Sequence, residues 1–227
     1  MRRAFFTGRK SLILVGVLAV SFLLIFEWDL GKLGSKGSPI VAILDLAPNH
    51  DELLSLHHLA LLKEAETTCT RCRVIAVSVS PNLEGNLADQ LLERIQFSFR
   101  QGARWIVIPL AFSGLEKREL LKSKVNLDDF IRTHGLRTYV SLGVGVRNPF
   151  VPEKVEDLYP HAAEKVILVD ALFPSGNRDP AANLAGSRSV LTVKLEPNDE
   201  SSSAYGSSLA AVRAAAQDAS QFLSSDK

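Results

Sequence analysis

The stretch IVAILDL, residues 40–46, is apolar except for Asp45, which stands one position before its end. Polar and apolar side chains do not alternate in it, so it predicts a β-strand that is buried on both faces of a sheet. Leucine, alanine and histidine side chains then recur at helical spacing between Leu53 and Ala65. A buried strand followed by an amphipathic helix is the repeating unit of a parallel α/β sheet.

The same alternation continues to the C-terminus. Further apolar runs of strand length occupy residues 74–79, 105–110, 138–144, 166–172 and 190–195, and helical patterns occupy residues 87–100, 115–134 and 208–223. We therefore predict an α/β fold, a doubly wound and mostly parallel sheet with helices on both faces. Sites in such sheets lie at the carboxyl ends of the strands, where Asp45 and the glycine-rich residues 143–147 follow two of the predicted strands.

The N-terminus differs in composition from the remainder of the chain. Four bases precede sixteen uncharged residues, SLILVGVLAVSFLLIF, and two acids follow: Arg2, Arg3, Arg9 and Lys10 before, Glu27 and Asp29 after. At about 1.5 Å per residue this run nearly crosses a hydrocarbon core of about 30 Å. We predict a cytoplasmic stub (residues 1–10), a transmembrane signal anchor (11–28), a linker (29–38) and one domain (39–227).

The positive-inside bias places that domain on the extracytoplasmic side of the cell membrane, in a single-pass protein whose N-terminal helix binds the membrane. The alternative is a cleaved signal peptide, but residues 27–38, EWDLGKLGSKGS, contain no cleavage site of the Ala-x-Ala kind. Without the N-terminal bases the chain has 22 bases against 25 acids. This balance disfavours a basic nucleic-acid-binding protein.

Two polar residues occupy positions at which the predicted fold places chemistry. Asp45 ends a buried strand, from which its carboxylate can orient an imidazole or hold a cation. Ser208 lies in the first turn of the predicted last helix, where free backbone N–H groups and the helix dipole can stabilise an oxyanion. Each also has a structural interpretation, since Asp caps strand ends and Ser caps helix starts.

The order of these segments resembles that of the subtilisin-like serine peptidases, the subtilases (peptidase family S8), over about residues 39–222. The resemblance implies that Asp45 takes the place of the catalytic Asp and Ser208 that of the nucleophile, with the Ser208 backbone in the oxyanion hole. It rests on IVAILDL, VIAVSV, WIVIPLAFSG, GLRTYVSLGVG, LYPHAAEKVILVDAL and YGSSLAAVRAAA; within these, Tyr159, Pro160, Ala162, Gly206, Ser207, Ala210 and Ala211 fit the family's motifs.

Other positions depart from the family's pattern. Ser55 falls where the catalytic histidine is expected, which leaves His57 and His58 as the nearby substitutes. A catalytic histidine must reach both the nucleophile and the Asp. Val144 stands where the family has an oxyanion Asn, a donor whose loss costs about 10²- to 10³-fold in turnover. These gaps predict a degenerate member with an impaired triad.

Cys69 and Cys72 form a C-x-x-C pair between the first predicted helix and the next strand. Outside the cytoplasm a local disulfide is expected, because a redox centre would place the pair at a helix start and a zinc site would need further ligands. The chain has no G-x-x-x-x-G-K-S/T loop, and GVGVRN (residues 143–148) lacks the third glycine of a dinucleotide site. We expect no cofactor and no metal.

The function expected from the sequence is that of a membrane-anchored, exported pseudopeptidase of subtilase fold that binds a peptide or protein partner or serves as a scaffold. The first alternative is an active serine endopeptidase that uses Asp45, a helix histidine and Ser208. The second is an unrelated doubly wound domain that binds a small ligand, because one α/β fold hosts many activities.

Overall fold

The structure is a computed structural model that describes residues 37–46, 52–80, 86–112, 114–142, 154–178, 188–196 and 206–225, without the side chains of residues 52–55 and 225. The chain divides into two units, Met1–Ser38 and Pro39–Lys227. Every described helix and strand belongs to the second unit.

Six strands form one sheet in the order β2-β1-β3-β4-β5-β6, and all five pairings are parallel. The strands are β1 (Ile40–Leu46), β2 (Arg73–Val79), β3 (Trp105–Ile108), β4 (Arg137–Ser141), β5 (Ile167–Leu172) and β6 (Val190–Lys194). The predicted α/β class and parallel sheet are thus confirmed. The strands match the predicted runs to within three residues at each end.

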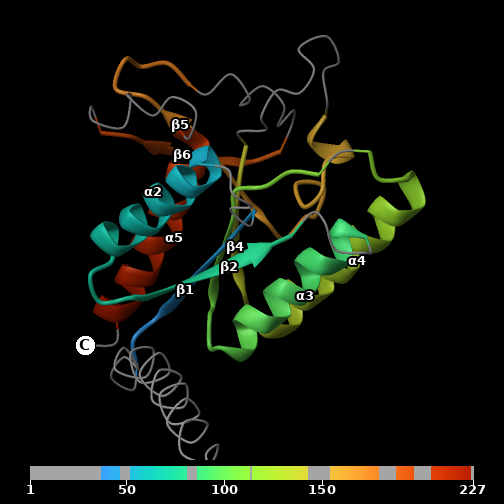
Figure 1. The fold of residues 1–227 in the computed structure, drawn as a ribbon, viewed down its shortest axis with the longest axis horizontal. Helices are drawn as coiled ribbons and strands as arrows, with labels where there is room; N and C mark the ends of the chain where they lie inside the picture. The colour runs from blue at the N-terminus through green and yellow to red at the C-terminus, as the bar shows by residue number, and fades with distance from the viewer. Residues whose placement is uncertain are drawn as a thin grey trace, which may run out of the picture. The chain divides into compact units, whose positions relative to one another are not determined.

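Helices cover both faces of the sheet, as predicted. They are α2 (Glu52–Thr68), α3 (Leu87–Arg100), α4 (Lys117–His134) and α5 (Gly206–Ser225), with a short 3₁₀ helix, η1 (Val155–Asp157), before β5. Figure 1 shows α2 and α5 along one side of the strands and α3 and α4 along the other. Along β1, Val41 and Ile43 pack into the cluster that contains α2 and α5, whereas Ala42 and Leu44 pack into the cluster on the other face. Successive side chains of β1 thus point to opposite faces of the sheet. Because both faces are buried, the strand is apolar along almost its whole length.

The chain reverses its direction of travel across the sheet at β1. From β1 it moves outward to β2, then returns to the other side of β1 to form β3 and proceeds toward β6. The carboxyl end of β1 therefore lies at a topological switch point, where ligands bind in open α/β sheets. Asp45 is located at that end.

The last helix is fixed to the middle of the sheet by its Asp218. Trp105 Nε1 of β3 and Tyr139 Oη of β4 donate hydrogen bonds to Asp218 Oδ2 at 2.8 and 2.7 Å, and Arg137 Nε lies 2.7 Å from the same oxygen. Burial, together with the negative charge of Asp218, raises the pKa of Tyr139. These bonds set the position of α5, and with it the position of Ser208.

None of the helices in the described part of the chain is long and apolar enough to span a membrane. The predicted cytoplasmic stub, signal anchor and most of the linker lie outside the described residues.

Candidate functional site

A histidine and a carboxylate meet at the switch point. His57 Nδ1 of α2 lies 2.9 Å from Asp45 Oδ2, and the backbone N–H of Leu46 donates to Asp45 Oδ1 at 2.8 Å. The Asp45 side chain is 2% exposed and that of His57 is 13% exposed. A buried carboxylate on Nδ1 fixes the imidazole ring and makes Nε2 the nitrogen that can accept a proton. The pair has the arrangement of an oriented general base.

The second predicted histidine lies beside the first. His58 Nδ1 is 3.6 Å from the same oxygen, Asp45 Oδ2, which is beyond hydrogen-bond distance. The structure thus brings three of the predicted site residues together, and His57 is the closer partner of Asp45. Ser55, where the family pattern placed the histidine, is in α2, but its side chain is not among those described.

Ser208 lies in the first turn of α5 and is 8% exposed. The first four N–H groups of a helix have no partner within the helix, so the Ser208 backbone N–H points toward the helix start, as predicted for an oxyanion donor. Gly206 begins the helix, and a Cβ atom placed there would meet Phe173 Cζ at 2.5 Å. A larger residue at this position would force the Phe173 ring or the start of α5 to move.

A salt bridge sets the two helices of the site against each other. Arg213 Nε of α5 lies 2.6 Å from Glu64 Oε1 of α2, and both side chains are largely buried. Both helices follow parallel strands and begin at the carboxyl edge of the sheet. Glu64 lies seven residues after His57 and Arg213 five residues after Ser208. The salt bridge thus joins the two helices one to two turns beyond His57 and Ser208.

No hydrogen bond joins Ser208 to His57 among the described residues. Ser208 Oγ makes no hydrogen bond within the described residues. Catalytic hydrogen bonds are often long in ligand-free enzymes and shorten when substrate binds. Val144, which stands in place of the oxyanion Asn, lies outside the described residues.

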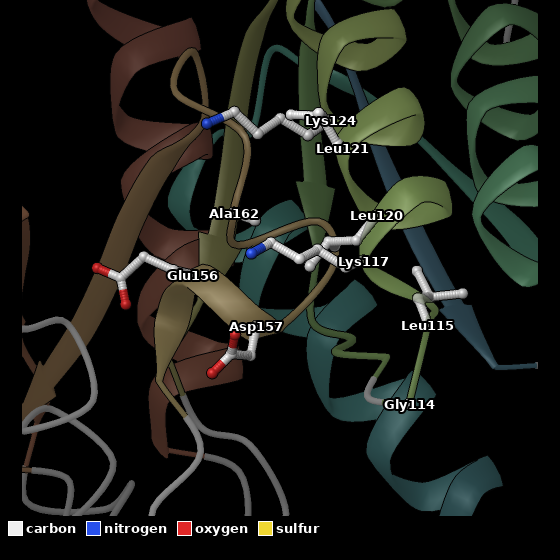
Figure 2. A pocket seen from close by; sticks show the side chains of 9 residues that line it. All are labelled: Gly114, Leu115, Lys117, Leu120, Leu121, Lys124, Glu156, Asp157 and Ala162. Carbon is white, nitrogen blue, oxygen red and sulfur yellow. The ribbon is translucent and has the colours of Figure 1, made fainter.

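A cavity of about 510 Å³ opens between α4 and η1. The bridge between Phe112 and Tyr159 holds the segment after β3 to the segment before β5, so both walls of the cavity continue from the carboxyl region of the sheet. In Figure 2 Lys117 extends from α4 toward the side on which Glu156 and Asp157 lie. The lining of the cavity is mostly apolar. It consists of Gly114, Leu115, Lys117, Leu120, Leu121, Lys124, Glu156, Asp157 and Ala162. An apolar side chain or short aliphatic segment fits a space of this size and character.

Cys69 and Cys72 are joined by a disulfide that follows the C-terminus of α2. A disulfide across two intervening residues closes a very small loop, so its effect is confined to the turn into β2. It is at the opposite end of α2 from the histidines and takes no part in the site.

No family model matches the chain, and no curated protein matches it. Among solved structures, the chain is similar to a lanthipeptide protease, with a TM-score of 0.56 and 15% identity, over 82% of this chain and 74% of that one. It also matches the prenylagaramide maturation protease PagA with a TM-score of 0.47 and 12% identity, over 82% of this chain and 77% of that one. The first match shows a shared fold; the second is too distant to carry an argument.

These findings correct the predicted family. The assignment to the subtilisin-like peptidase family is withdrawn, because no family model or curated protein matches and the structural likeness, at 15% identity, establishes a fold and no family membership.

The predicted loss of function is corrected as well. The pseudopeptidase prediction rested on a missing histidine and on Val144 in place of the oxyanion Asn. His57 is in hydrogen-bond contact with Asp45, and the solved structure that shares the fold is a protease. The sequence did contain a signal: a strand-end carboxylate followed after twelve residues by a histidine on the next helix.

Proposed function

We propose that residues 39–227 form a serine-type peptidase in which Asp45 orients His57, His57 is the general base and Ser208 is the nucleophile. The observation that carries the proposal is the 2.9 Å contact of His57 Nδ1 with the buried carboxylate of Asp45 at the switch point of the sheet. The position of Ser208 at the start of the neighbouring helix supports it. The solved structure that shares the fold is that of a lanthipeptide protease, which supports a peptide as the substrate.

The chemistry follows from the arrangement. His57 Nε2 takes the proton of the Ser208 hydroxyl as Oγ attacks the carbonyl carbon of the peptide bond. Asp45 stabilises the imidazolium that forms, and backbone N–H groups in the first turn of α5 stabilise the oxyanion. The imidazolium then protonates the leaving amine and the C–N bond breaks, which leaves an acyl-enzyme. A water molecule, activated by His57, hydrolyses the acyl-enzyme and restores the serine.

The cavity between α4 and η1 supplies a place for part of the substrate. Its apolar lining and its separated lysine and carboxylate groups suit an apolar side chain flanked by the polar backbone of a peptide. A peptide that lay along the carboxyl edge of the sheet would be held by this cavity on the α4 side while the scissile bond lay near Ser208. In this arrangement the cavity would select among substrates.

Labelling with a fluorophosphonate probe tests the nucleophile, because such probes react with serines that an adjacent base has activated. The full-length protein is expected to be labelled on Ser208, and Ser208→Ala to lose the label. Ser207→Ala is the matched control and retains it. An unlabelled wild-type protein, or a label that persists in Ser208→Ala, contradicts the proposal.

Asp45→Asn is the second arm of the same experiment. Removal of the carboxylate from a catalytic histidine costs about 10⁴-fold in a serine peptidase, because the ring adopts the wrong tautomer. Labelling of Asp45→Asn is therefore expected to fall by about that factor while the folded structure, followed by circular dichroism, is retained. An unchanged labelling rate would remove Asp45 from the mechanism.

A further inference from the structure

The second histidine of α2 has no role in the chemistry just described, yet it lies against the same carboxylate. His58 Nδ1 is 3.6 Å from Asp45 Oδ2, and the His58 side chain is 15% exposed. Its Nδ1 atom is buried and makes no hydrogen bond within the described part of the chain. A buried ring nitrogen without a partner is costly, so its position against the carboxylate requires an explanation.

The tautomer of His58 follows from its surroundings. A bare lone pair on Nδ1 would face the negative oxygen of Asp45 and be repelled, whereas an N–H group in the same place is attracted. Nδ1 therefore carries the proton. Oδ2 is thus hydrogen-bonded to His57 and attracted by the nearby N–H of His58, while Oδ1 accepts a hydrogen bond from the Leu46 N–H.

The carboxylate has no other cationic partner among the described residues. Arg213 of α5, the helix that packs on α2, is engaged with Glu64. The ion pairs that Asp45 does form are those with His57 and His58. Two imidazoles therefore share one buried carboxylate, at distances that differ by 0.7 Å.

We infer that His58 is a positioning residue: its Nδ1–H group, 3.6 Å from Asp45 Oδ2, attracts the carboxylate electrostatically and holds it in line with His57. The catalytic consequence rests on the proposed function, whereas the effect on the Asp45–His57 hydrogen bond does not. With His58 in place, both His58, beside Oδ2, and the Leu46 N–H, on Oδ1, oppose rotation of the carboxylate away from His57. Without it, the carboxylate is held by Leu46 and His57 alone, and the base is less well aligned with the nucleophile.

Two variants separate the N–H donor from the bulk of the ring. His58→Leu removes the donor, and His58→Gln keeps an N–H group that can reach the carboxylate. In the full-length protein, the first-order rate of fluorophosphonate labelling at saturation is expected to fall about tenfold in His58→Leu, with the half-saturating probe concentration unchanged. His58→Gln is expected to retain a rate within about threefold of wild type.

Proton NMR provides a measurement that does not depend on catalysis. The Nδ1 proton that His57 shares with Asp45 gives a low-field signal, which is expected to shift or broaden in His58→Leu and to stay near its wild-type position in His58→Gln. Equal urea unfolding midpoints of the two variants exclude a general loss of structure. If His58→Leu does not fold, His58→Phe replaces it as the variant without the N–H donor, and His58→Asn replaces His58→Gln as the variant that keeps one.

The inference is overturned if the low-field signal and the labelling rate are unchanged in His58→Leu, or if both variants lose the rate equally. A wild-type protein that is not labelled at all contradicts the proposed peptidase function instead. In that case the NMR comparison still decides whether His58 positions Asp45.

Discussion

The guanidinium of Arg213 lies 2.6 Å from the carboxylate of Glu64, which joins α5 to α2 at a point one to two turns beyond the residues of the site. Each helix contributes one side chain to the proposed reaction, His57 from α2 and Ser208 from α5. The salt bridge therefore joins the helix of the proposed base to the helix of the proposed nucleophile, and its loss is expected to affect both stability and reactivity.

Arg213→Leu leaves Glu64 largely buried without its partner. The free energy of unfolding is expected to fall by about 2–3 kcal/mol, since breaking one side of a buried pair leaves an uncompensated charge. Urea denaturation measures this. The matched control is Arg132→Leu, which breaks the exposed pair with Asp129 and is expected to cost below about 1 kcal/mol. Equal costs for the two variants would contradict a structural role for the Glu64 pair.

Gly206→Ala tests the close packing at the start of α5. The added Cβ would lie 2.5 Å from Phe173 Cζ, so the ring must move or the helix start must shift. Fluorophosphonate labelling of Ser208 is expected to fall by about tenfold or more, because a misplacement of about 1 Å at a reacting group is costly. The double variant Gly206→Ala/Phe173→Leu is expected to recover most of the labelling rate. No recovery would show that the glycine acts through the backbone instead.

His161 is expected to make the protein less stable in mild acid. Burial lowers the pKa of His161 from 6.5 to about 4, against the opposing effect of its hydrogen bond to the Ser141 carbonyl. Between pH 6.5 and 4 the unfolded chain binds this proton and the folded chain does not, so stability is complete above about pH 6.5 and is lost as the pH falls through that window. The loss is about 2 kcal/mol at pH 5.

The measurement is the difference in unfolding free energy between pH 7 and pH 5 for wild type and for His161→Gln, which keeps a donor for the Ser141 carbonyl. The variant is expected to lose about 2 kcal/mol less on acidification than wild type. His134→Gln removes a half-buried histidine at the end of α4, which packs against Phe99 and Phe130, and serves as the control. An identical pH dependence of stability in all three proteins would show that folding does not lower the pKa of His161.

Filling the cavity tests whether it selects substrates. Leu120→Trp places a large ring in the cavity, and Val125→Trp places one on the exposed face of the same helix. Leu120→Trp is expected to reduce the number and rate of cleavages in a mixed peptide library, measured by mass spectrometry, while fluorophosphonate labelling of Ser208 stays at the wild-type rate. Val125→Trp is expected to change neither. A loss of labelling in Leu120→Trp would mean that the site itself had been disturbed.

The membrane anchor remains a prediction from the sequence. If residues 11–28 form a retained signal anchor, the full-length protein stays in the membrane fraction after washing with alkaline carbonate. Release of a shortened chain into the supernatant, with a new N-terminus near Trp28, would support the cleaved signal peptide instead.

The sequence by itself determined the class of the fold and located the two ends of the proposed site. Continuous apolar runs such as residues 40–46 must be buried on both faces, which requires helices on both sides of a parallel sheet, and this is what the structure contains. The position of Asp45 at a strand end and of Ser208 at a helix start also followed from local pattern, because both depend on neighbours a few residues away.

Only the tertiary structure decided which histidine is hydrogen-bonded to Asp45. The comparison of motifs placed the base at Ser55 and predicted a lost function, whereas the turn of α2 above β1 brings His57 to Asp45 and leaves His58 slightly farther away. The angular position of a helix about its own axis is set by packing against the sheet and by long-range contacts such as Glu64–Arg213, which join residues 149 positions apart. Local periodicity does not contain that information, so the pairing of base and carboxylate could not be derived without the fold.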